Sequence, residues 1–369
     1  MANKLRGREL GLRFQGTPGQ FNAITDVPGV LIGQTTLDNG FAQSADPALP
    51  QIRTGVTALL PFGYDAEPRI AQAGMFALNG NGEMTGSHWI RDAGYFLGPV
   101  CLTNTHSVGI THHAATKWMI TQYHDAFHKG HLWAMPVVAE TYDGVLNDIN
   151  GQHISEQHVL DALTSASSGP IAEGNTGGGA GMICYEYKGG TGSSSRIIEI
   201  DGARYTIGAL VQANHGTRDW LTVLGEPVGR SMRNDLLFDR ESGSIIVVIA
   251  TDAPLRPDQL HRVAKRGSIG IGRSGTPGGN NSGDIFLAFS TANARGLPQH
   301  DTAHQSMVHL NDEMLDSVYQ AVVEAIDESI VNALLAAEDT PTFKPQGLTC
   351  RSIDAEALAT MLRVVGKCH

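Results

Sequence analysis

Apolar residues occur along the chain in short runs that glycine or proline residues bound. The clearest run covers residues 245–250, where six apolar residues follow one another without interruption. A run of this length without polar positions predicts a strand that is buried on both faces. Further apolar runs of this kind predict strands at residues 30–37, 55–63, 135–144, 196–202, 205–214 and 284–293.

Other segments repeat their apolar residues at the spacing of a helix. Residues 311–338 are the clearest case, with an apolar stripe from Leu315 to Leu334 and with Asn311 or an adjacent aspartate available as the N-terminal cap. Two further helices are predicted in the same way at residues 106–130 and 354–367. Strands and helices are mixed without regular alternation, which favours an α+β fold of layered sheets flanked by helices over a doubly wound fold.

Composition narrows the classes of function. The formal net charge is −11 and no cluster of Lys and Arg is present, which argues against a nucleic-acid partner. The four cysteines are scattered and show no metal-binding spacing, which fits reduced thiols in a cytoplasmic protein better than a disulfide framework. No apolar stretch reaches the ~18 residues of a membrane helix, and no signal-peptide core is present, so we expect a cytoplasmic protein without a membrane partner. Because no change of composition marks a linker, we expect residues 1–369 to form one domain.

Two glycine-rich stretches could bind a nucleotide and one histidine pair could bind a metal, but their sequences do not match the known motifs of such sites. Residues 79–86 and 173–182 lack both the Gly-Lys-Ser/Thr ending of a P-loop and the glycine spacing of a dinucleotide-binding turn. His124 and His128 stand four residues apart, but the glutamate of the zinc motif H-E-x-x-H is absent. We therefore expect no bound nucleotide and no metal, and the glycines favour close approach of backbone segments.

A serine stands at the start of the clearest strand, directly after a glycine. Gly243 and Ser244 follow the polar residues 240–242 and precede the apolar run. One interpretation is ordinary turn chemistry, because glycine accepts unusual backbone angles and serine bonds to nearby backbone groups. The alternative is that the Gly243–Ser244 bond cleaves itself and leaves Ser244 as a new N-terminal nucleophile. The dipeptide alone favours the turn.

Polar side chains also stand at the ends of other predicted strands. Ser282 and Asp284 lie on a glycine-flanked turn that enters the following strand. Glu140 and Tyr142 end another strand and face the same side of it, because they are two residues apart. Asn214 ends a third strand. Each residue alone fits a turn or a strand end, but together these hydroxyls, carboxylates and the amide can assemble a hydrolytic site.

Four sequence blocks together resemble one known family. They are GSIIVVIATDAPL, NNSGDIFLAFSTAN, AETYDGVLNDING and LVQANHG, and the similarity extends from residue 24 to the final predicted helix. The chain thereby resembles the L-aminopeptidase/D-esterase-amidase and β-aminopeptidyl peptidase family. The resemblance implies a four-layer α-β-β-α sandwich, layered like the N-terminal nucleophile hydrolases but with different connectivity. It also implies homo-oligomers, commonly tetramers, and no cofactor.

By resemblance, Ser244 is the nucleophile of a self-processing serine aminopeptidase. The precursor is expected to cleave itself before Ser244 into an α chain of residues 1–243 and a β chain of residues 244–369. Ser282 matches the second serine of the site, and Asp284 takes the position of the acidic residue that orients it. A serine hydroxyl is a weak nucleophile until a base takes its proton, and the α-amine that cleavage frees has an unperturbed pKa of about 7.7–8.0.

The same resemblance assigns residues around the substrate, which is expected to be a short peptide, amide or ester with a free amino group. Tyr142 and Asn214 match residues that stabilise the oxyanion or the substrate. Glu140 matches the carboxylate that faces the substrate's amino group, and Trp133 matches a wall of the pocket. The sequence leaves open whether α- or β-amino acids are preferred, and whether of L or D configuration, because one methylene changes binding by only ~1–3 kcal/mol.

Two alternative functions also remain open at this stage. The first is a self-cleaving acyltransferase related to the ornithine acetyltransferases, whose nucleophile is a threonine rather than the serine found here. The second is a non-catalytic protein that binds a small molecule and keeps the Gly243–Ser244 bond intact.

Overall fold

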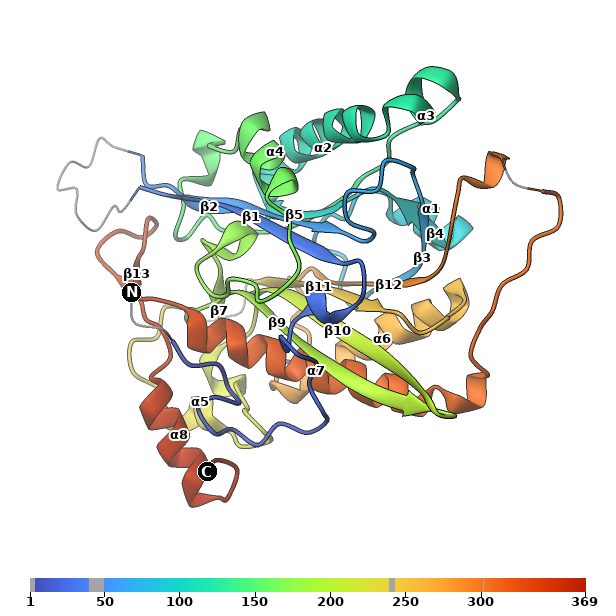
Figure 1. Cartoon of the computed structure of the whole chain (residues 1–369). Coiled ribbons are helices and arrows are strands. Elements are labelled where there is room, and N and C mark those ends of the chain that lie inside the picture. The colour runs from blue at the N-terminus through green and yellow to red at the C-terminus, as the bar shows by residue number, and fades with distance from the viewer. Residues whose placement is uncertain (1–3, 40–49, 239–242, 301) are drawn as a thin grey trace.

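Two β-sheets lie face to face in the centre of the molecule, with helices on both outer surfaces (Figure 1). The smaller sheet has four strands in the order β1-β2-β5-β6, and the larger has six in the order β4-β3-β12-β11-β10-β9. Two neighbouring pairs are parallel, β5 with β6 and β11 with β12, and the other neighbours are antiparallel. The computed structural model describes residues 4–39, 50–238, 243–300 and 302–369.

The strands of both sheets vary widely in length. The smaller sheet consists of β1 (Leu31–Asp38), β2 (Arg53–Leu60), β5 (Val100–Asn104) and β6 (Val137–Thr141). The larger sheet consists of β3 (Ile70–Ala77), β4 (Tyr95–Leu97), β9 (Gly190–Ile200), β10 (Ala203–Asn214), β11 (Ser244–Thr251) and β12 (Asp284–Arg295).

Four helices form the two outer layers. Helices α2 (Val108–Gln122) and α4 (Glu156–Thr164) pack on the four-stranded sheet. Helices α6 (Pro257–Arg273) and α7 (Asp316–Ala336) pack on the six-stranded sheet. The layers follow the order helix, sheet, sheet, helix, so the four-layer α-β-β-α sandwich expected from the sequence is confirmed.

Shorter elements complete the fold. They are the helices α1 (Ser87–Ala93), α3 (His124–Lys129), α5 (Val228–Ser231) and α8 (Ala355–Val364), and the strands β7 (Ile183–Cys184), β8 (Tyr187–Lys188), β13 (Thr340–Pro341) and β14 (Thr349–Cys350). None of the helices formed by the described residues has both the length and the apolar character needed to cross a membrane.

Alternate residues of β11 face the two sides of the larger sheet. Ile245, Val247 and Ile249 pack in the core beneath α6 and α7. The residues between them pack in the core that separates the two sheets, together with apolar residues of the smaller sheet. The burial on both faces that the uninterrupted apolar run predicts is therefore confirmed. This burial fixes the register of β11, because a slip of one residue would exchange the two faces.

Two predicted helices are interrupted near one end. The segment predicted as one helix at residues 106–130 forms α2 and α3, with Tyr123 between them in a non-helical conformation (φ −104°, ψ 40°). In the other segment a 3₁₀ turn, Asp312–Met314, precedes α7. Asn311 caps that turn, as predicted, by accepting a hydrogen bond from the N–H of Glu313 over 3.2 Å.

Helix α6 has no counterpart among the predicted elements. Its sequence contains Gly267, Gly270 and Gly272, and each glycine lowers helix propensity by about 1 kcal/mol relative to alanine. A Cβ atom at Gly267 would lie 2.1 Å from the ring of Phe286 on β12, and one at Gly270 would lie 2.8 Å from Ile326 on α7. These two glycines therefore allow the helix to pack closely against its neighbours, and that packing compensates for the low propensity.

Candidate active site

Strand register places Ser244 among other predicted site residues. Ser244 is the first residue of β11 and lies opposite Asn214, the last residue of β10. On the other side of β11, Asp284 begins the parallel strand β12 and lies opposite Ile245. The beginnings of two parallel strands and the end of an antiparallel strand therefore meet at one end of the six-stranded sheet.

The hydroxyl of Ser244 is bound by the backbone that leads into β12. The N–H of Gly283 donates a hydrogen bond to Ser244 Oγ over 2.9 Å. Beside this glycine, Ser282 Oγ donates to Asp284 Oδ1 over 2.5 Å, and Asn79 Nδ2 donates to Asp284 Oδ2 over 3.2 Å. Asp284 thus holds the hydroxyl of Ser282 in one orientation. The sequence analysis did not identify Asn79, although it lies in one of the two glycine-rich stretches.

Glu140 approaches the same place from the smaller sheet. Its Oε1 accepts a hydrogen bond from the backbone N–H of Glu83 over 2.9 Å, and its Oε2 accepts one from the hydroxyl of Thr105. A Cβ atom on Gly82 would lie 3.3 Å from Glu140 Oε1 and 3.5 Å from the Cα of Gly283. Gly82 therefore lies between the Glu140 carboxylate and Gly283, whose N–H binds the Ser244 hydroxyl.

Burial has the largest effect on the pKa of both acidic side chains. It raises the pKa of Glu140, and hydrogen bonds from Thr105 and from the N–H of Glu83 oppose the rise. Burial likewise raises the pKa of Asp284 against its two side-chain hydrogen bonds. In the part of the chain that the structure describes, neither carboxylate forms an ion pair with Lys or Arg. A buried carboxylate without a cation is costly, so a cationic ligand group would be stabilising beside either one.

Gly243 occupies a position that has no room for a side chain. A Cβ atom there would lie 1.9 Å from the carbonyl oxygen of Asn214 and 2.9 Å from the Cα of His215. The glycine before Ser244 is therefore required by close packing against the end of β10. This steric requirement is additional to the turn chemistry considered from the sequence. The polar turn at residues 240–242 lies outside the described residues.

Asn214 and Tyr142 line a small pocket beside Gly243, with a volume of about 30 Å³. Asn214 Oδ1 accepts a hydrogen bond from the N–H of Ile183 over 2.8 Å, and Nδ2 donates to the carbonyl of Tyr142 over 3.1 Å. An amide nitrogen carries two hydrogens, so Asn214 can donate a second hydrogen bond. Phe238, which precedes the predicted cleavage site, lines the same pocket.

Trp133 lies apart from this pocket. It lines a different pocket with Trp89 and Tyr95, packs edge-on against His131 at 5.6 Å, and is 47% exposed. Within one copy of the chain, the structure brings together the other predicted site residues but not Trp133. Its predicted role as a wall of the substrate pocket has no counterpart in these contacts.

His215 lies beside the site, although the sequence analysis identified no histidine there. It lines the pocket with Asn214, and its Nδ1 lies 3.7 Å from the Sγ of Cys184. Its ring packs edge-on against Tyr185 at 5.0 Å. Burial lowers the pKa of His215 to about 3, so the ring is neutral and too weak a base to take a proton efficiently near pH 7. His215 is therefore a packing residue.

A buried glutamate holds the segment ahead of the predicted cleavage site. Glu186 Oε2 accepts hydrogen bonds from the backbone N–H groups of Leu237 and Phe238 over 2.9 and 3.2 Å, and Oε1 accepts one from the N–H of Arg218 over 2.9 Å. The Arg218 guanidinium donates to two carbonyl groups earlier in that segment, over 2.8 and 3.0 Å. No sequence motif marks Glu186, whose partners lie far from it in the chain. The segment is thereby fixed five residues before Gly243.

The possible metal ligands of the described residues are scattered. Among the described residues, no three His, Cys, Asp or Glu side chains are arranged to hold a metal ion. His124 and His128 stack on each other at 3.9 Å on the exposed surface of α3. The side chains gathered around Ser244 carry hydroxyl, carboxyl and amide groups.

Known proteins are similar to this chain in sequence and in fold. The family described as peptidase family S58 matches residues 22–347. A β-peptidyl aminopeptidase, BapA, of Sphingosinicella microcystinivorans is 47% identical over 348 residues, which cover 90% of this chain and 86% of that protein.

Two solved structures extend the comparison. The L-aminopeptidase D-Ala-esterase/amidase of Ochrobactrum anthropi, a prototype for the serine aminopeptidases and a variant of the Ntn-hydrolase fold, is 52% identical with a TM-score of 0.93, covering 99% of both chains. A β-aminopeptidase from a Burkholderia species is 44% identical with a TM-score of 0.88, covering 98% of this chain and 99% of that one. The resemblance found in the sequence is thereby confirmed, and this chain belongs to peptidase family S58, a family of hydrolases.

Proposed function

We propose that this chain is a serine aminopeptidase that activates itself by cleaving the Gly243–Ser244 bond. The observation that supports this most directly is that the Ser244 hydroxyl accepts a hydrogen bond from the N–H of Gly283, beside the hydrogen-bonded Ser282 and Asp284. Cleavage divides the single expected domain into an α chain and a β chain. The two chains remain together, because β10 of the α chain pairs with β11 of the β chain over eight residues.

Self-cleavage proceeds by acyl transfer from nitrogen to oxygen. Ser244 Oγ attacks the carbonyl carbon of Gly243, an ester C–O bond forms, the peptide C–N bond breaks, and the nitrogen takes up the proton that the hydroxyl loses. Water then hydrolyses the ester, which frees the Gly243 carboxylate together with the hydroxyl and α-amine of Ser244. Glycine favours the attack, because no Cβ atom shields its carbonyl carbon.

The mature enzyme uses the same hydroxyl on its substrate. Ser244 Oγ attacks the first amide or ester carbonyl of a short substrate and forms an acyl-enzyme, which water hydrolyses. The freed α-amine, with an ordinary pKa of about 7.7–8.0, accepts or relays the proton, and Ser282, oriented by Asp284, passes it to the leaving group. Asn214 Nδ2 has a second hydrogen that it can donate to the oxyanion, and one such donor contributes about 2.7–4 kcal/mol in well-studied enzymes.

Glu140 is expected to make hydrolysis depend on a free amino group. The wild type should hydrolyse an aminoacyl p-nitroanilide and reject its N-acetyl form, because only the ammonium pairs with the buried carboxylate. Glu140→Gln keeps the shape and removes the charge, so kcat/KM for the free amine should fall by about 30-fold or more, the equivalent of at least ~2 kcal/mol. Measurement of kcat/KM for both substrates, with wild type and variant, checks this expectation.

A matched control for that variant is Glu156→Gln at the start of α4, which removes a half-buried carboxylate that pairs with Lys117 over 2.7 Å and should leave the preference unchanged. Equal rates of the wild type on the free and acetylated substrates would reject the role of Glu140. That result would indicate a general esterase or amidase in place of an aminopeptidase.

Glu186 is expected to position the chain for self-cleavage. Glu186→Gln weakens the bonds to the N–H groups of Leu237 and Phe238, and hydrogen bonds to a charged group contribute about 1.5–3 kcal/mol. The rate at which the two chains appear should therefore fall by about 10-fold or more, while kcat of the cleaved fraction stays near that of the wild type. Time courses on denaturing gels measure the first quantity. Processing at the wild-type rate would show that Glu186 has no part in it.

The expected substrates are short peptides, amides or esters with a free amino group, in line with the activities named for the relatives. The cell compartment is the cytoplasm, and the assembly is a homo-oligomer, with a tetramer of αβ units as the expected form. Acetyl transfer to ornithine or glutamate, measured directly, would instead indicate the related acyltransferases. An intact Gly243–Ser244 bond in purified protein that hydrolyses none of these substrates would indicate the non-catalytic binding protein.

A further inference from the structure

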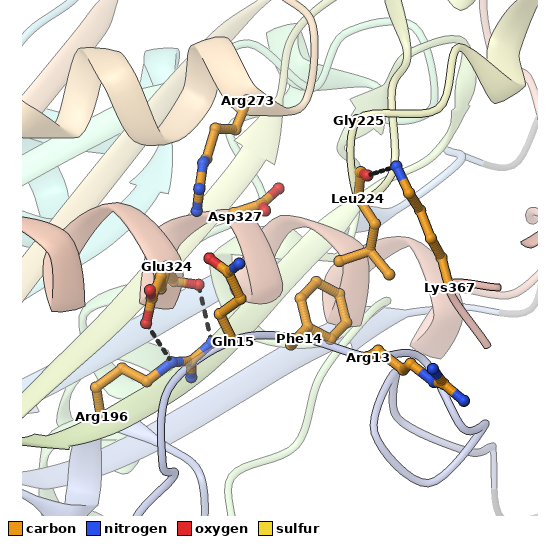
Figure 2. Close-up of a pocket in the computed structure, with 10 residues that line it drawn as sticks. All are labelled: Arg13, Phe14, Gln15, Arg196, Leu224, Gly225, Arg273, Glu324, Asp327 and Lys367. Carbon is orange, nitrogen blue, oxygen red and sulfur yellow. Dashed lines mark hydrogen bonds and ion pairs between the residues drawn. The ribbon is translucent and has the colours of Figure 1, made fainter. Parts of the chain in front are cut away.

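A second and larger pocket lies between the N-terminal segment, α7 and the end of α6 (Figure 2). Its volume is about 460 Å³, many times the ~10–15 Å³ that a cavity needs to hold one water molecule. Charged and apolar side chains line it, and the proposed reaction uses none of them. The lining residues on which the following argument depends are Phe14, Arg196, Leu224, Arg273, Glu324 and Asp327.

This pocket is remote from Ser244. Arg196 lies on β9 opposite Ile207 of β10, and Ile207 is seven residues from Asn214, the partner of Ser244. At ~3.3 Å per residue of strand, the two places are about 23 Å apart along the sheet. The Arg196 side chain is directed to the outer helix layer, since it pairs with Glu328 of α7 over 2.7 Å. The pocket is therefore distinct from the candidate active site.

Asp327 presents a carboxylate whose hydrogen-bonding capacity is not filled. It is only 6% exposed, and its Oδ1 is buried without a hydrogen bond from any described residue. Burial raises the pKa of Asp327 to about 6, and the charges of Arg273 and Arg196 oppose the rise. Glu324, by contrast, pairs with Arg196 over 3.5 Å. Because a buried polar atom without a partner costs free energy, a donor bound at Asp327 would be stabilising.

Arg273 brings the complementary charge to the same pocket. Its side chain is exposed and extends into the pocket toward the level of Asp327 (Figure 2). Among the described residues, its guanidinium forms no hydrogen bond or ion pair, and it lies beyond ion-pair distance of Asp327. Lys367, another cation of the lining, pairs with Glu226 over 2.8 Å. Arg273 and Asp327 therefore border the same space, and neither has an ion-pair partner among the described residues.

We propose that this pocket binds the zwitterion of a free apolar amino acid, with its ammonium group on Asp327 and its carboxylate on Arg273. A simple anion would be repelled by Asp327, and a simple cation would be repelled by Arg273, whereas a zwitterion satisfies both. Phe14 and Leu224 lie next to each other on the pocket wall and provide apolar contact for the side chain (Figure 2). Binding at this site does not depend on the aminopeptidase reaction, so the two proposals can fail separately.

Isothermal titration calorimetry with L-leucine tests the charge requirement on the full-length wild-type protein. Leucine is expected to bind, whereas 4-methylpentanoate, which lacks the ammonium group, and 3-methylbutylamine, which lacks the carboxylate, should bind at least about 10-fold more weakly. No binding of leucine, or equal affinity for leucine and either analogue, would overturn the proposal.

Three variants determine where leucine binds. Asp327→Asn and Arg273→Gln should each weaken its binding by at least about 10-fold, and Glu140→Gln, in the candidate active site, should leave it unchanged. As a second readout, leucine should raise the Tm of the wild type and of Glu140→Gln but not that of Asp327→Asn. The Tm of Asp327→Asn without leucine, expected to equal or exceed that of the wild type, shows that the variant is folded. Loss of binding in Glu140→Gln with retention in Asp327→Asn would place leucine in the active site and reject the second pocket.

Discussion

Replacement of Ser244 by alanine is expected to leave one intact chain of 369 residues without aminopeptidase activity. Self-cleavage and substrate hydrolysis both need the same oxygen atom, Ser244 Oγ, so one substitution removes both. Loss of a serine nucleophile lowers kcat by about 10⁶-fold in a well-studied serine protease. Denaturing mass spectrometry should find two chains in the wild type, the second beginning at Ser244, and a single chain in the variant.

A suitable control is Ser268→Ala on α6, where the hydroxyl donates to the carbonyl of Lys265 over 2.6 Å within the same helix. This variant should process and hydrolyse as the wild type does. Full activity in wild-type protein that remains one chain would contradict self-activation. Cleavage at another bond would contradict the assignment of Ser244 as the new N-terminus.

Replacement of Ser282 by alanine is expected to lower kcat by about 10²–10⁴-fold in protein that has already been cleaved, the range of a general acid–base contribution. The hydroxyl of Ser282 is held by Asp284 over 2.5 Å, so its removal breaks the path by which a proton reaches the leaving group. Single-turnover and steady-state measurements on the cleaved fraction separate kcat from KM. A loss confined to KM would indicate a role in binding.

Ser290 provides the matched control on the same strand. It is buried six residues after Asp284, and its hydroxyl donates to the carbonyl of Ala253 over 2.6 Å. Ser290→Ala removes a buried hydroxyl without touching the site, so it should lower stability and leave kcat near the wild-type value. A near-normal kcat in the cleaved Ser282→Ala variant would show that Ser282 is only a structural residue of the turn.

Much of the candidate site could be predicted because its residues stand where strands begin or end. The apolar run after Ser244 marks the start of β11. The apolar run before Asn214 marks the end of β10, and the run after Asp284 marks the start of β12. Strand ends are local features, since they depend on residues that are neighbours in the sequence. The family resemblance, and no single motif, predicted that these strand-end residues form one site.

Other residues of the site carry no local signal. Asn79 bonds to Asp284 across 205 positions of the chain, and Glu186 holds Leu237 and Phe238 about fifty positions later. An asparagine in a glycine-rich turn and a lone glutamate are ordinary residues in such stretches. Their importance arises from contacts that only the packed layers create.

The sequence by itself determined the layered class of fold, the boundaries of the central strand β11 and the chemical groups available at the strand ends. Each of these follows from periodicity or composition within a short window. The tertiary structure decided that the glycine-containing helix α6 forms against Phe286 and Ile326. It also decided that Trp133 lines a different pocket from Asn214 and Tyr142, and that Asp327 and Arg273 border another. These features depend on the close approach of segments distant in sequence, because packing and burial, rather than local preference, set their free energies.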